Sequence, residues 1–356
     1  NLFFKKQNMK KKSLNAKKTT PRSILKYLEN KNINKVFKSF NNSLNKEKTI
    51  IKKIGVAVSG GPDSLSLAYF AKCYALINGI EVKFFIVDHK LREESSKEAK
   101  KIRGLLKNFN INCKLLIWYG KKPKSNIQSI ARNNRYNILK KACKKYKISH
   151  LLIGHHVDDL YENFFIRLTR GSGLRGLSSF GETIVDKKDK IIILRPLIDK
   201  KKEDLIYISE NIFNFFLNDP SNKNLDFKRA RIRKLISEFN KEGFDKKKLD
   251  LTIRNLKSAN NAINYYVNKN IKRNTTFIIK KNKILINASF FEQPEEVLFR
   301  SLSIILTKVS SRYYSPRGKS ILDLINRIRF EKIKKLTLGG CCVEKVNKTL
   351  LITKEK

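Results

Sequence analysis

The sequence has few acidic residues, and it contains no apolar run of the length that spans a membrane. Its 356 residues include 31 Asp and Glu against 78 Lys and Arg, which gives a formal net charge of +47. This imbalance favours a polyanionic partner such as a nucleic acid, because dispersed Lys and Arg neutralise phosphates. The many Lys, Asn and Ile residues also fit AT-rich codon usage, and we expect both causes to contribute.

Cysteine is scarce as well, and its spacing excludes the usual zinc and redox motifs. The chain has five cysteines and no C-x-x-C pair. Cys73, Cys113 and Cys143 lie in apolar contexts, so we expect them to be reduced core residues. Reduced cysteines favour a cytoplasmic protein, here of a bacterium.

The first glycine-rich turn lacks the features of two widespread nucleotide-binding motifs. No Lys follows its glycines as in a Walker loop, and they do not have the spacing of the dinucleotide fingerprint. Instead, the apolar run at 54–58 precedes Ser59-Gly60-Gly61-Pro62-Asp63-Ser64 and a second apolar segment. This order predicts a strand, a tight loop and a helix, with backbone N–H groups directed at an anion such as a phosphate.

An acidic residue, Asp63, lies inside this anion-binding turn, where its carboxylate would repel phosphates. We therefore expect a Mg²⁺ ion between Asp63 and the phosphates. Asp63 or Ser64 could also cap the following helix. The simpler alternative is a Gly-Pro turn in which both residues serve only as caps.

Short apolar runs alternate with amphipathic stretches from residue 54 to about 198. The expected strands lie at 54–58, 82–87, 113–118, 150–154 and 191–194, and the expected helices at 64–77, 95–109, 126–146 and 158–170. This alternation predicts an α/β fold with a doubly wound, mostly parallel sheet. Asp88, His89, His155 and His156 follow strands, so we expect them at the carboxyl edge of the sheet, where ligands bind.

The sequence predicts three parts. Residues 1–50 form a basic segment, expected to be partly disordered, with Met9 as the true start and organelle import as the minor alternative to a bacterial leader. Residues 51–217 form the nucleotide-binding catalytic domain. Residues 218–356 form a basic helical and α+β region that binds RNA. We expect later helices at 199–216, 227–239, 246–267, 293–308 and 316–329, with a hairpin at 277–286.

A second candidate site follows the strand at 150–154. His155, Asp158, Asp159 and Glu162 are spaced i, i+3, i+4 and i+7, which places them on one face of a helix. Such a face suits Mg²⁺, a cationic amine or general base catalysis. The alternative is a charged first turn that complements the helix dipole.

Arginines provide candidate phosphate contacts. Arg167, Arg170 and Arg175 surround a Gly-Ser-Gly loop and could bind phosphate or RNA backbone. Arg132 and Arg135 are three residues apart on an expected helix and could reach a triphosphate, although a solvated helix face is the simpler interpretation.

Seven motifs occur in an order that resembles the tRNA(Ile)-lysidine synthetases, a family of the ATP-pyrophosphatase (PP-loop) superfamily. They lie at 59–64, 87–92, 131–136, 154–159, 167–177, 195–197 and 219–233. Lys90 stands where the family usually has Gly, and Ala230 where it usually has Asn. The resemblance implies an adenine-nucleotide α-hydrolase-like catalytic domain.

The resemblance also implies the reaction. Lysine would be ligated to C2 of the wobble cytidine in a tRNA(Ile) with a CAU anticodon. ATP would adenylate the C2 oxygen and release pyrophosphate, and the ε-amine of free L-lysine would then displace AMP. The implied ATP-binding residues are Ser59, Gly60, Gly61, Pro62, Asp63, Ser64, Asp88, His89, Arg132 and Arg135, with Asp63 also at the metal.

The implied catalytic residues are Asp63, His155, Asp158, Asp159 and Glu162. We expect Asp158 or Asp159 to position lysine, with His155 and Glu162 in support, and which of these four contacts lysine stays open. The implied tRNA-binding residues are Arg167, Arg170, Arg175, Arg231 and Arg233, and the enzyme could be a homodimer. Two rival interpretations are a tRNA-thiolating enzyme, which needs a cysteine near the site, and an inactive RNA-binding module, which predicts a degraded loop.

Overall fold

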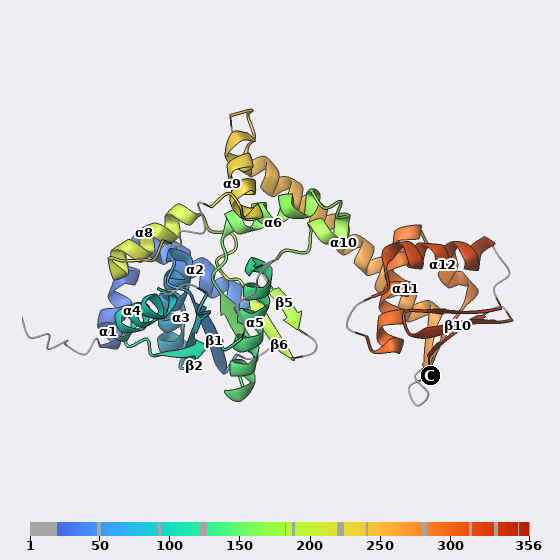
Figure 1. Cartoon of the computed structure of the whole chain (residues 1–356), viewed down its shortest axis with the longest axis horizontal. Helices are drawn as coiled ribbons and strands as arrows, with labels where there is room; N and C mark the ends of the chain where they lie inside the picture. Colours follow the sequence, from blue (N-terminus) through green and yellow to red (C-terminus); the bar gives the residue numbers. More distant parts are fainter. Residues whose placement is uncertain are drawn as a thin grey trace, which may run out of the picture. The chain divides into compact units, whose positions relative to one another are not determined.

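The computed structural model describes residues 20–47, 51–91, 94–120, 127–181, 183–186, 189–218, 224–239, 241–278, 283–312, 315–330, 334–347 and 349–355. The chain forms two compact units (Figure 1). Unit 1 comprises the chain up to Gly171 together with Phe180–Phe244, and unit 2 comprises Ser172–Ser179 and Asp245–Lys356. None of the described helices is both long enough and apolar enough to cross a membrane.

Unit 1 is built on a six-stranded sheet of order β3-β2-β1-β4-β6-β5. The strands are β1 Lys53–Val58, β2 Glu81–Asp88, β3 Cys113–Ile117, β4 His150–Ile153, β5 Thr183–Asp186 and β6 Ile191–Leu194. The first four and β6 are mutually parallel, which confirms the predicted doubly wound, mostly parallel sheet. Strand β5, which was not predicted, pairs with β6 in the antiparallel sense at the sheet edge.

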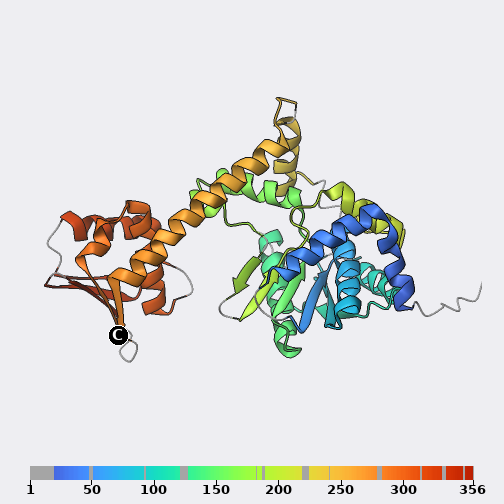
Figure 2. The ribbon, with the colours of Figure 1, turned by 180° about the vertical axis from the view of Figure 1, so that it is seen from behind.

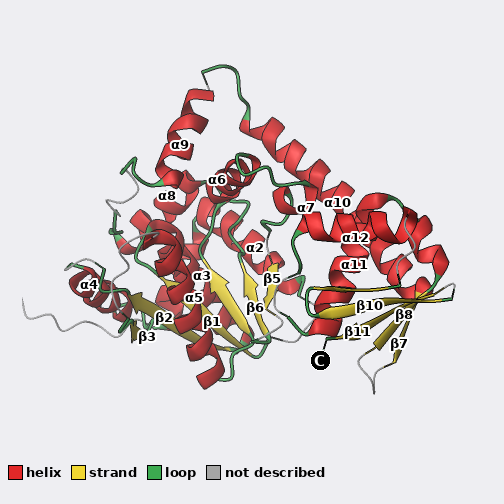
Figure 3. Ribbon diagram, turned by 45° about the vertical axis from the view of Figure 1, so that its right-hand side comes forward, coloured by secondary structure: helices red, strands yellow, loops and turns green. Residues whose placement is uncertain are grey.

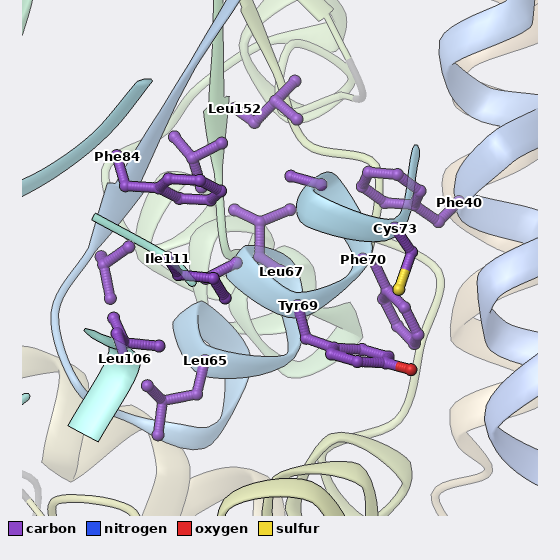
Figure 4. Close-up of a cluster of buried hydrophobic side chains, with 14 of the residues drawn as sticks. Phe40, Leu65, Leu67, Tyr69, Phe70, Cys73, Phe84, Leu106, Ile111 and Leu152 are labelled. Atoms are coloured by element: carbon purple, nitrogen blue, oxygen red, sulfur yellow. The ribbon is translucent and has the colours of Figure 1, made fainter. Parts of the chain in front are cut away.

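Helices cover both faces of this sheet. Helices α3 Pro62–Asn78 and α4 Ser95–Lys107 pack on one face and α5 Ile127–Lys145 on the other. Of the other helices of unit 1, α8 Lys202–Phe213 packs on α3, and α6 Val157–Leu168 packs with α9 Lys228–Phe239. Because side chains alternate along a strand, neighbouring residues enter different cores. Phe84 and Leu152 pack with α3 and α4 (Figure 4), whereas Phe85 and Leu151 pack with Leu139 of α5 on the other face.

The basic N-terminal segment contains a helix that sequence reasoning missed. Helix α1 (Pro21–Leu25) and the 3₁₀ turn η1 (Lys26–Glu29) lead into α2 (Lys31–Asn45), which lies against α3 (Figure 2). The apolar residues of α2 recur at helical spacing and are buried: Ile33, Val36, Phe37, Phe40 and Leu44. Helix α3 is apolar on nearly every side, so it needs this second cover. Residues 20–47 are therefore mostly helical, whereas residues 1–19 of the segment expected to be partly disordered lie outside the described residues.

Unit 2 joins helices to an antiparallel sheet of order β7-β8-β11-β10-β9 (Figure 3). Its strands are β7 Thr275–Ile278, β8 Lys283–Ile286, β9 Lys335–Leu338, β10 Cys341–Val346 and β11 Thr349–Lys354. Its helices are α7 Leu174–Leu177, α10 Lys246–Asn274, η4 Ala288–Glu292, α11 Glu295–Ser310 and α12 Gly318–Phe330. Leu302 of α11, Ile325 of α12 and Ile352 of β11 share one apolar core.

The two units divide after Phe244, beyond the boundary expected at 217/218. Helix α9 stays with unit 1 because its Arg233 pairs with Glu162 of α6. The ring of Phe165 in α6 also lies 5.9 Å from the rings of both Phe239 and Phe244. Sequence reasoning placed α9 in the second region because of its basic composition, which does not reveal this packing.

Candidate active site

The loop between β1 and α3 is held in shape by one hydroxyl group. Ser64 Oγ accepts the backbone N–H groups of Ser59 at 3.1 Å and of Gly60 at 3.0 Å. Gly61 is the N-cap of α3 and Pro62 follows at the first helical position, so the prediction that Asp63 or Ser64 caps this helix was wrong. The expectation that the loop amides point at an anion is also wrong for these two, because both turn inward to Ser64.

The two glycines of this loop differ in how much space surrounds them. Gly60 has φ +91°, and a Cβ there would lie 2.8 Å from atoms of both Ile102 and Leu217. A Cβ on Gly61 would meet nothing within 4 Å. No side chain caps the start of α3, so the first backbone N–H groups of the helix are free to bind a ligand. Together with the open space at Gly61, these N–H groups form the kind of site that binds phosphates.

Gly154 brings the second motif against this loop. A Cβ on Gly154 would lie 3.0 Å from the backbone C and O of Asp63 and 3.1 Å from Ser64 Cα. Only glycine allows β4 to end in such close contact with the first turn of α3. This contact places the residues that follow β4 beside Asp63.

Asp63 and Asp159 meet at His156. The Nε2 atom of His156 lies 3.6 Å from Asp63 Oδ2 and 3.6 Å from Asp159 Oδ2. Burial raises the pKa of Asp63, which His156 and Lys202 partly offset. The Oδ1 atom of Asp63 is buried without a hydrogen-bond partner in the described part of the chain. Such an unpartnered oxygen is costly unless a ligand reaches it.

His156 also builds the start of α6. Its backbone N–H donates to Asp159 Oδ2 at 3.1 Å, and its Nδ1 accepts the backbone N–H of Asp158 at 3.3 Å. Together these bonds form a capping box. Burial acts to raise the pKa of Asp159, but His155, His156 and Arg229 outweigh it, and the pKa is lowered. Asp159 is therefore an ionised residue that fixes the helix start as well as facing the site.

His155 is held as a neutral ring. Arg195 Nε donates to His155 Nδ1 at 3.1 Å, which leaves the ring proton on Nε2. The Arg195 guanidinium lies 4.5 Å from the centre of the Phe180 ring. Burial lowers the pKa of His155 to about 3. At neutral pH this imidazole can donate through Nε2, but it is a poor proton acceptor.

Glu162 keeps one free oxygen. Its Oε1 pairs with Arg233 Nε, while its Oε2 is buried without a hydrogen-bond partner among the described atoms. Burial raises the pKa of Glu162, and Arg233 partly offsets this. Arg229, one helical turn before Arg233, lies 4.0 Å from Asp159 Oδ1. Helix α9 thus supplies two cations to the acidic face of α6.

Comparisons with known proteins agree with this geometry. Residues 29–239 match a family model described as the PP-loop domain. A tRNA(Ile)-lysidine synthase of Orientia tsutsugamushi is 34% identical over 85% of this chain and 70% of its own length. The chain belongs to the tRNA(Ile)-lysidine synthase family. It is thus a ligase of the PP-loop superfamily that uses ATP.

Further relatives support the assignment to the tRNA(Ile)-lysidine synthases. The synthase of Wolbachia pipientis is 31% identical over 89% of this chain and 74% of its own length. That of Bradyrhizobium diazoefficiens is 36% identical over 58% of each chain. Among solved structures, a U34-tRNA thiolase from Methanococcus maripaludis aligns with a TM-score of 0.54 and 16% identity over 64% of this chain and 79% of its own. That likeness concerns the fold.

Asp88 and His89, two predicted ATP-binding residues of this lysidine synthase family member, differ in whether their side chains are free to bind a ligand. Asp88 is fully engaged, because its carboxylate accepts Ser95 Oγ at 2.8 Å, Ser96 Oγ at 2.6 Å and the Lys90 amide at 3.0 Å. Its role is to shape the loop after β2. His89 has a buried Nδ1 without a hydrogen-bond partner among the described atoms, and burial lowers its pKa to about 4. His89 is thus the better placed to meet a ligand.

The predicted arginines do not gather at one place. Arg132 and Arg135 act electrostatically on His155, and Arg135 also on His89, so both lie near the site. Arg231 turns away and donates to the carbonyl groups of Leu225 and Asp226. Arg167 and Arg170 belong to unit 1 and Arg175 to unit 2. Arg92 and the motif at 219–222 lie outside the described residues.

Sequence reasoning missed three basic residues at the site: Lys202, Arg195 and Arg229. Lys202 partly offsets the effect of burial, which raises the pKa of Asp63; Arg195 donates to His155, and Arg229 faces Asp159. Arg195 lay in a recognised motif that had been given no role. In a chain with 78 Lys and Arg, a basic residue carries no signal by itself.

The donor set fits a Mg²⁺ ion, the cofactor implied by the family. Asp63 Oδ1 offers an unpartnered carboxylate oxygen beside the uncapped start of α3. No group of three or more His, Cys, Asp and Glu side chains among the described residues could hold a metal. An ion here would take its remaining ligands from phosphates and water, as Mg²⁺ usually does.

Proposed function

We propose that this protein ligates L-lysine to C2 of the wobble cytidine of a CAU-anticodon tRNA(Ile), through an adenylated cytidine, releasing AMP and pyrophosphate. The observation that carries the proposal is the contact between the loop at 59–64 and the acidic face of α6, which Gly154 makes possible. It sets a phosphate-binding turn next to carboxylates that suit a cationic amine. The reaction takes place in the bacterial cytoplasm.

In this proposal the loop and Asp63 serve the ATP half of the reaction. The uncapped N-terminus of α3 receives the phosphates. Asp63, with Asp159 beside it, would hold Mg²⁺, and a bound ion would neutralise phosphate charge. His89, Arg132 and Arg135 contact the nucleotide. Asp88 acts indirectly, since its hydrogen bonds to Ser95 and Ser96 shape the loop.

The lysine half of the reaction centres on Glu162. The ε-amine must be deprotonated before it attacks C2, and the ordinary pKa of lysine is about 10.4. Glu162 Oε2 is the acidic-face oxygen that is buried without a partner in the described structure, and burial raises the pKa of the carboxyl. A raised pKa favours proton acceptance at neutral pH. We therefore assign Glu162 to receive the ε-ammonium group, with Asp158 and Asp159 as supporting charges.

His155 is a positioning donor in this scheme. Arg195 occupies its Nδ1 and burial lowers its pKa to about 3, so it does not serve as the base. Its Nε2–H is the atom available to a carbonyl or phosphate oxygen. The double restraint by Arg195 and Phe180 keeps that donor in one direction.

The test is incorporation of radiolabelled lysine. We expect the protein, with ATP and Mg²⁺, to label a CAU-anticodon tRNA(Ile) transcript and to form AMP and pyrophosphate in equal amounts. An elongator methionine tRNA transcript is the matched control, because it shares the anticodon sequence but should not be labelled. Equal labelling of both transcripts, or none of either, would refute the proposal. Light scattering of the same sample tests the predicted homodimer.

The rival reaction, tRNA thiolation, needs a reactive thiol. Burial raises the pKa of Cys73, Cys113 and Cys143 to about 12, so these thiols stay protonated. Cys341 and Cys342 belong to unit 2, whereas the loop belongs to unit 1. The cysteines therefore favour lysine over sulfur as the nucleophile.

A further inference from the structure

A lysine and a tyrosine meet at the carboxyl edge of the unit 1 sheet, apart from the loop at 59–64 and the acidic face of α6. The ammonium group of Lys90 lies 5.3 Å from the centre of the Tyr119 ring. Lys90 lies two residues beyond the end of β2, and Tyr119 lies two residues beyond the end of β3. These strands are neighbours in the sheet, so their pairing brings the two side chains together. We call Lys90 and Tyr119 the β2–β3 pair.

The backbone of Lys90 has a conformation that favours glycine. Its φ is +49°, and Asp88 Oδ1 accepts its N–H group at 3.0 Å. Lys90 stands where the lysidine synthases usually have Gly. Lys147 and Lys190, the other lysines with positive φ among the described residues, precede β4 and β6 and so lie at the amino edge of the sheet. Lys90 is strained at the edge where ligands bind, which is a reason to expect a function for its side chain.

Tyr119 presents an aromatic ring to solvent. Its side chain is 82% exposed, although large aromatic side chains are normally well buried. The residues on either side of it are fixed. The Trp118 N–H donates to the carbonyl oxygen of Asp88 at 3.0 Å, and a Cβ on Gly120 would lie 2.5 Å from Trp118 Nε1. The indole therefore packs against Gly120, and the Tyr119 ring keeps open surface that a flat ligand can cover.

An exposed ring held by a cation fits a nucleobase. Aromatic side chains stack on bases, and every base has a flat face for this contact. The attraction between the Lys90 ammonium group and the Tyr119 ring restrains the ring on one side. The base would stack on the other side.

The place of the pair in the sheet favours the base of ATP. Strand β3 is two strands away from β1, so the ends of these strands are about 10 Å apart at the usual spacing. With its phosphates at the loop after β1, an ATP molecule extends over a comparable length and can bring its base to the end of β3. His89, whose buried Nδ1 has no hydrogen-bond partner among the described atoms, lies in the loop after the intervening β2.

We propose that the β2–β3 pair binds the adenine of ATP. Tyr119 stacks on the base, and Lys90 is a positioning residue that holds the Tyr119 ring. The inference rests on the proposed function for the place of the phosphates at the loop at 59–64. It assigns the base to a part of the sheet edge that the proposed function leaves without a role.

Calorimetric titration of the full chain with ATP and Mg²⁺, without tRNA or lysine, tests the stacking contact. We expect Tyr119→Ala to weaken the Kd for ATP about tenfold, which is within the range for stacking on one ring. Tyr119→Phe keeps the ring and should bind as the wild type does. Tyr265→Ala, which removes an exposed ring from unit 2, is the matched control and should also bind normally. A wild-type Kd for ATP in Tyr119→Ala would overturn the inference.

Inorganic tripolyphosphate separates the base from the phosphates. It carries phosphates and no base, so we expect Tyr119→Ala and the wild type to bind it equally well. An equal loss of affinity for ATP and tripolyphosphate in Tyr119→Ala would also overturn the inference, because the residue would then act on the phosphate site. Circular dichroism verifies that each variant is folded.

Lys90→Gly tests the positioning role. Glycine accepts the positive φ, so we expect a melting temperature equal to or above that of the wild type. We expect the Kd for ATP to weaken about two- to fivefold, as for loss of an exposed cation–π contact. Lys147→Gly is the matched control, because it makes the same change at a positive φ on the amino edge. Equal ATP affinity in the two variants would refute the role of Lys90.

RNA is the other source of a base, and fluorescence anisotropy with a labelled tRNA(Ile) transcript tests it. We expect Tyr119→Ala to bind the transcript as the wild type does. Weaker tRNA binding together with unchanged ATP binding would mean that the pair binds an RNA base, and the inference would fail. If the wild type binds ATP through Tyr119 but incorporates no lysine, the proposed function fails and the adenine contact stands.

Discussion

The two units treat ionisable side chains in opposite ways. Unit 1 buries His155, Asp159 and Glu162 and half-buries Asp63 at the carboxyl edge of its sheet, and one oxygen each of Asp63 and Glu162 has no partner among the described atoms. Unit 2 buries one charged side chain, Arg300, among its described residues, and spreads its cations over exposed surface. Buried carboxylates are costly to a fold, so they indicate chemistry. Exposed cations cost little and suit an extended polyanion.

The same contrast explains the two sheets. In unit 1 the parallel strands all end at one edge, so residues from β1, β2 and β4 meet there although they are far apart in sequence. In unit 2 the antiparallel strands alternate in direction, so neither edge collects their ends. Chemistry is therefore expected in unit 1 and surface recognition in unit 2.

Asp63→Asn should have the largest effect among the variants that test whether chemistry is confined to unit 1. The substitution keeps the size of the side chain but removes the charge that faces the phosphates. We expect formation of AMP from ATP to fall on the order of 10²–10³-fold, as for loss of a preorganised electrostatic contact. Because burial raises the pKa of Asp63, we expect the stability of unit 1 to stay the same or rise. An unchanged rate of AMP release would contradict the assigned role.

Glu162→Gln should separate the two half-reactions. We expect pyrophosphate release to continue while lysine transfer falls about 10²-fold, because the amide cannot accept the ammonium proton. The measurement is a quench assay that follows pyrophosphate and labelled lysine in the same sample. Asp158→Asn is the matched control, since Asp158 is half-buried and we expect a smaller loss. Equal loss of both half-reactions in Glu162→Gln would show that this residue does not act on lysine.

The sequence predicted most elements of unit 1, because apolar runs and glycines mark the ends of its strands. It predicted the loop, the acidic face of α6 and the parallel sheet. It did not predict α2, since a basic composition concealed the apolar spacing from Ile33 to Leu44. It also missed β5, whose residues are mostly exposed at the sheet edge.

Partners of the site residues were harder to predict than the residues themselves. The spacing of His155 and Asp159 suggested a common helix face. Arg195, which occupies Nδ1 of His155 and so prevents it from acting as a base, lies 40 residues further along the chain. Glu162 and Arg233 are 71 residues apart. Asp88 was predicted at the right strand end, yet its carboxylate is used by Ser95 and Ser96. Contacts of this kind depend on packing that no local pattern records.

Acid should unfold unit 1 before unit 2. All four histidines of the chain lie in unit 1, and burial lowers the pKa of His155 to about 3 and of His89 to about 4. An unfolded imidazole binds its proton near pH 6.5, so this stability is complete above pH 6.5 and is lost as the pH falls toward those values. Each of these two histidines should lower the free energy of unfolding of unit 1 by about 2 kcal/mol between pH 7 and pH 5.

Two signals can report this acid transition separately. Trp118, the only tryptophan, lies in unit 1 and reports that unit by fluorescence, whereas far-ultraviolet circular dichroism reports both units. The carboxyl groups of Asp63 and Glu162 have the opposite effect on stability. Burial raises their pKa values, so their protonation stabilises unit 1 as the pH falls. The variant His155→Gln isolates the imidazole, and its unfolding free energy should fall less steeply with acid. A slope equal to that of the wild type would contradict burial of a neutral His155.

The smallest expected effect is on the stability of unit 2, and it tests whether the buried charge of Arg300 has a structural role. Arg300 donates to Glu296 at 2.7 Å and to Asn260 and Asn264, which ties α10 to α11. We expect Arg300→Met to destabilise unit 2 by about 1 kcal/mol, because the two asparagines lie near solvent and can bind water instead. Trp118 fluorescence should show an unchanged transition for unit 1, while the circular dichroism transition of unit 2 moves to lower urea. If AMP formation fell with it, Arg300 would serve the chemistry, and the contrast between the two units would fail.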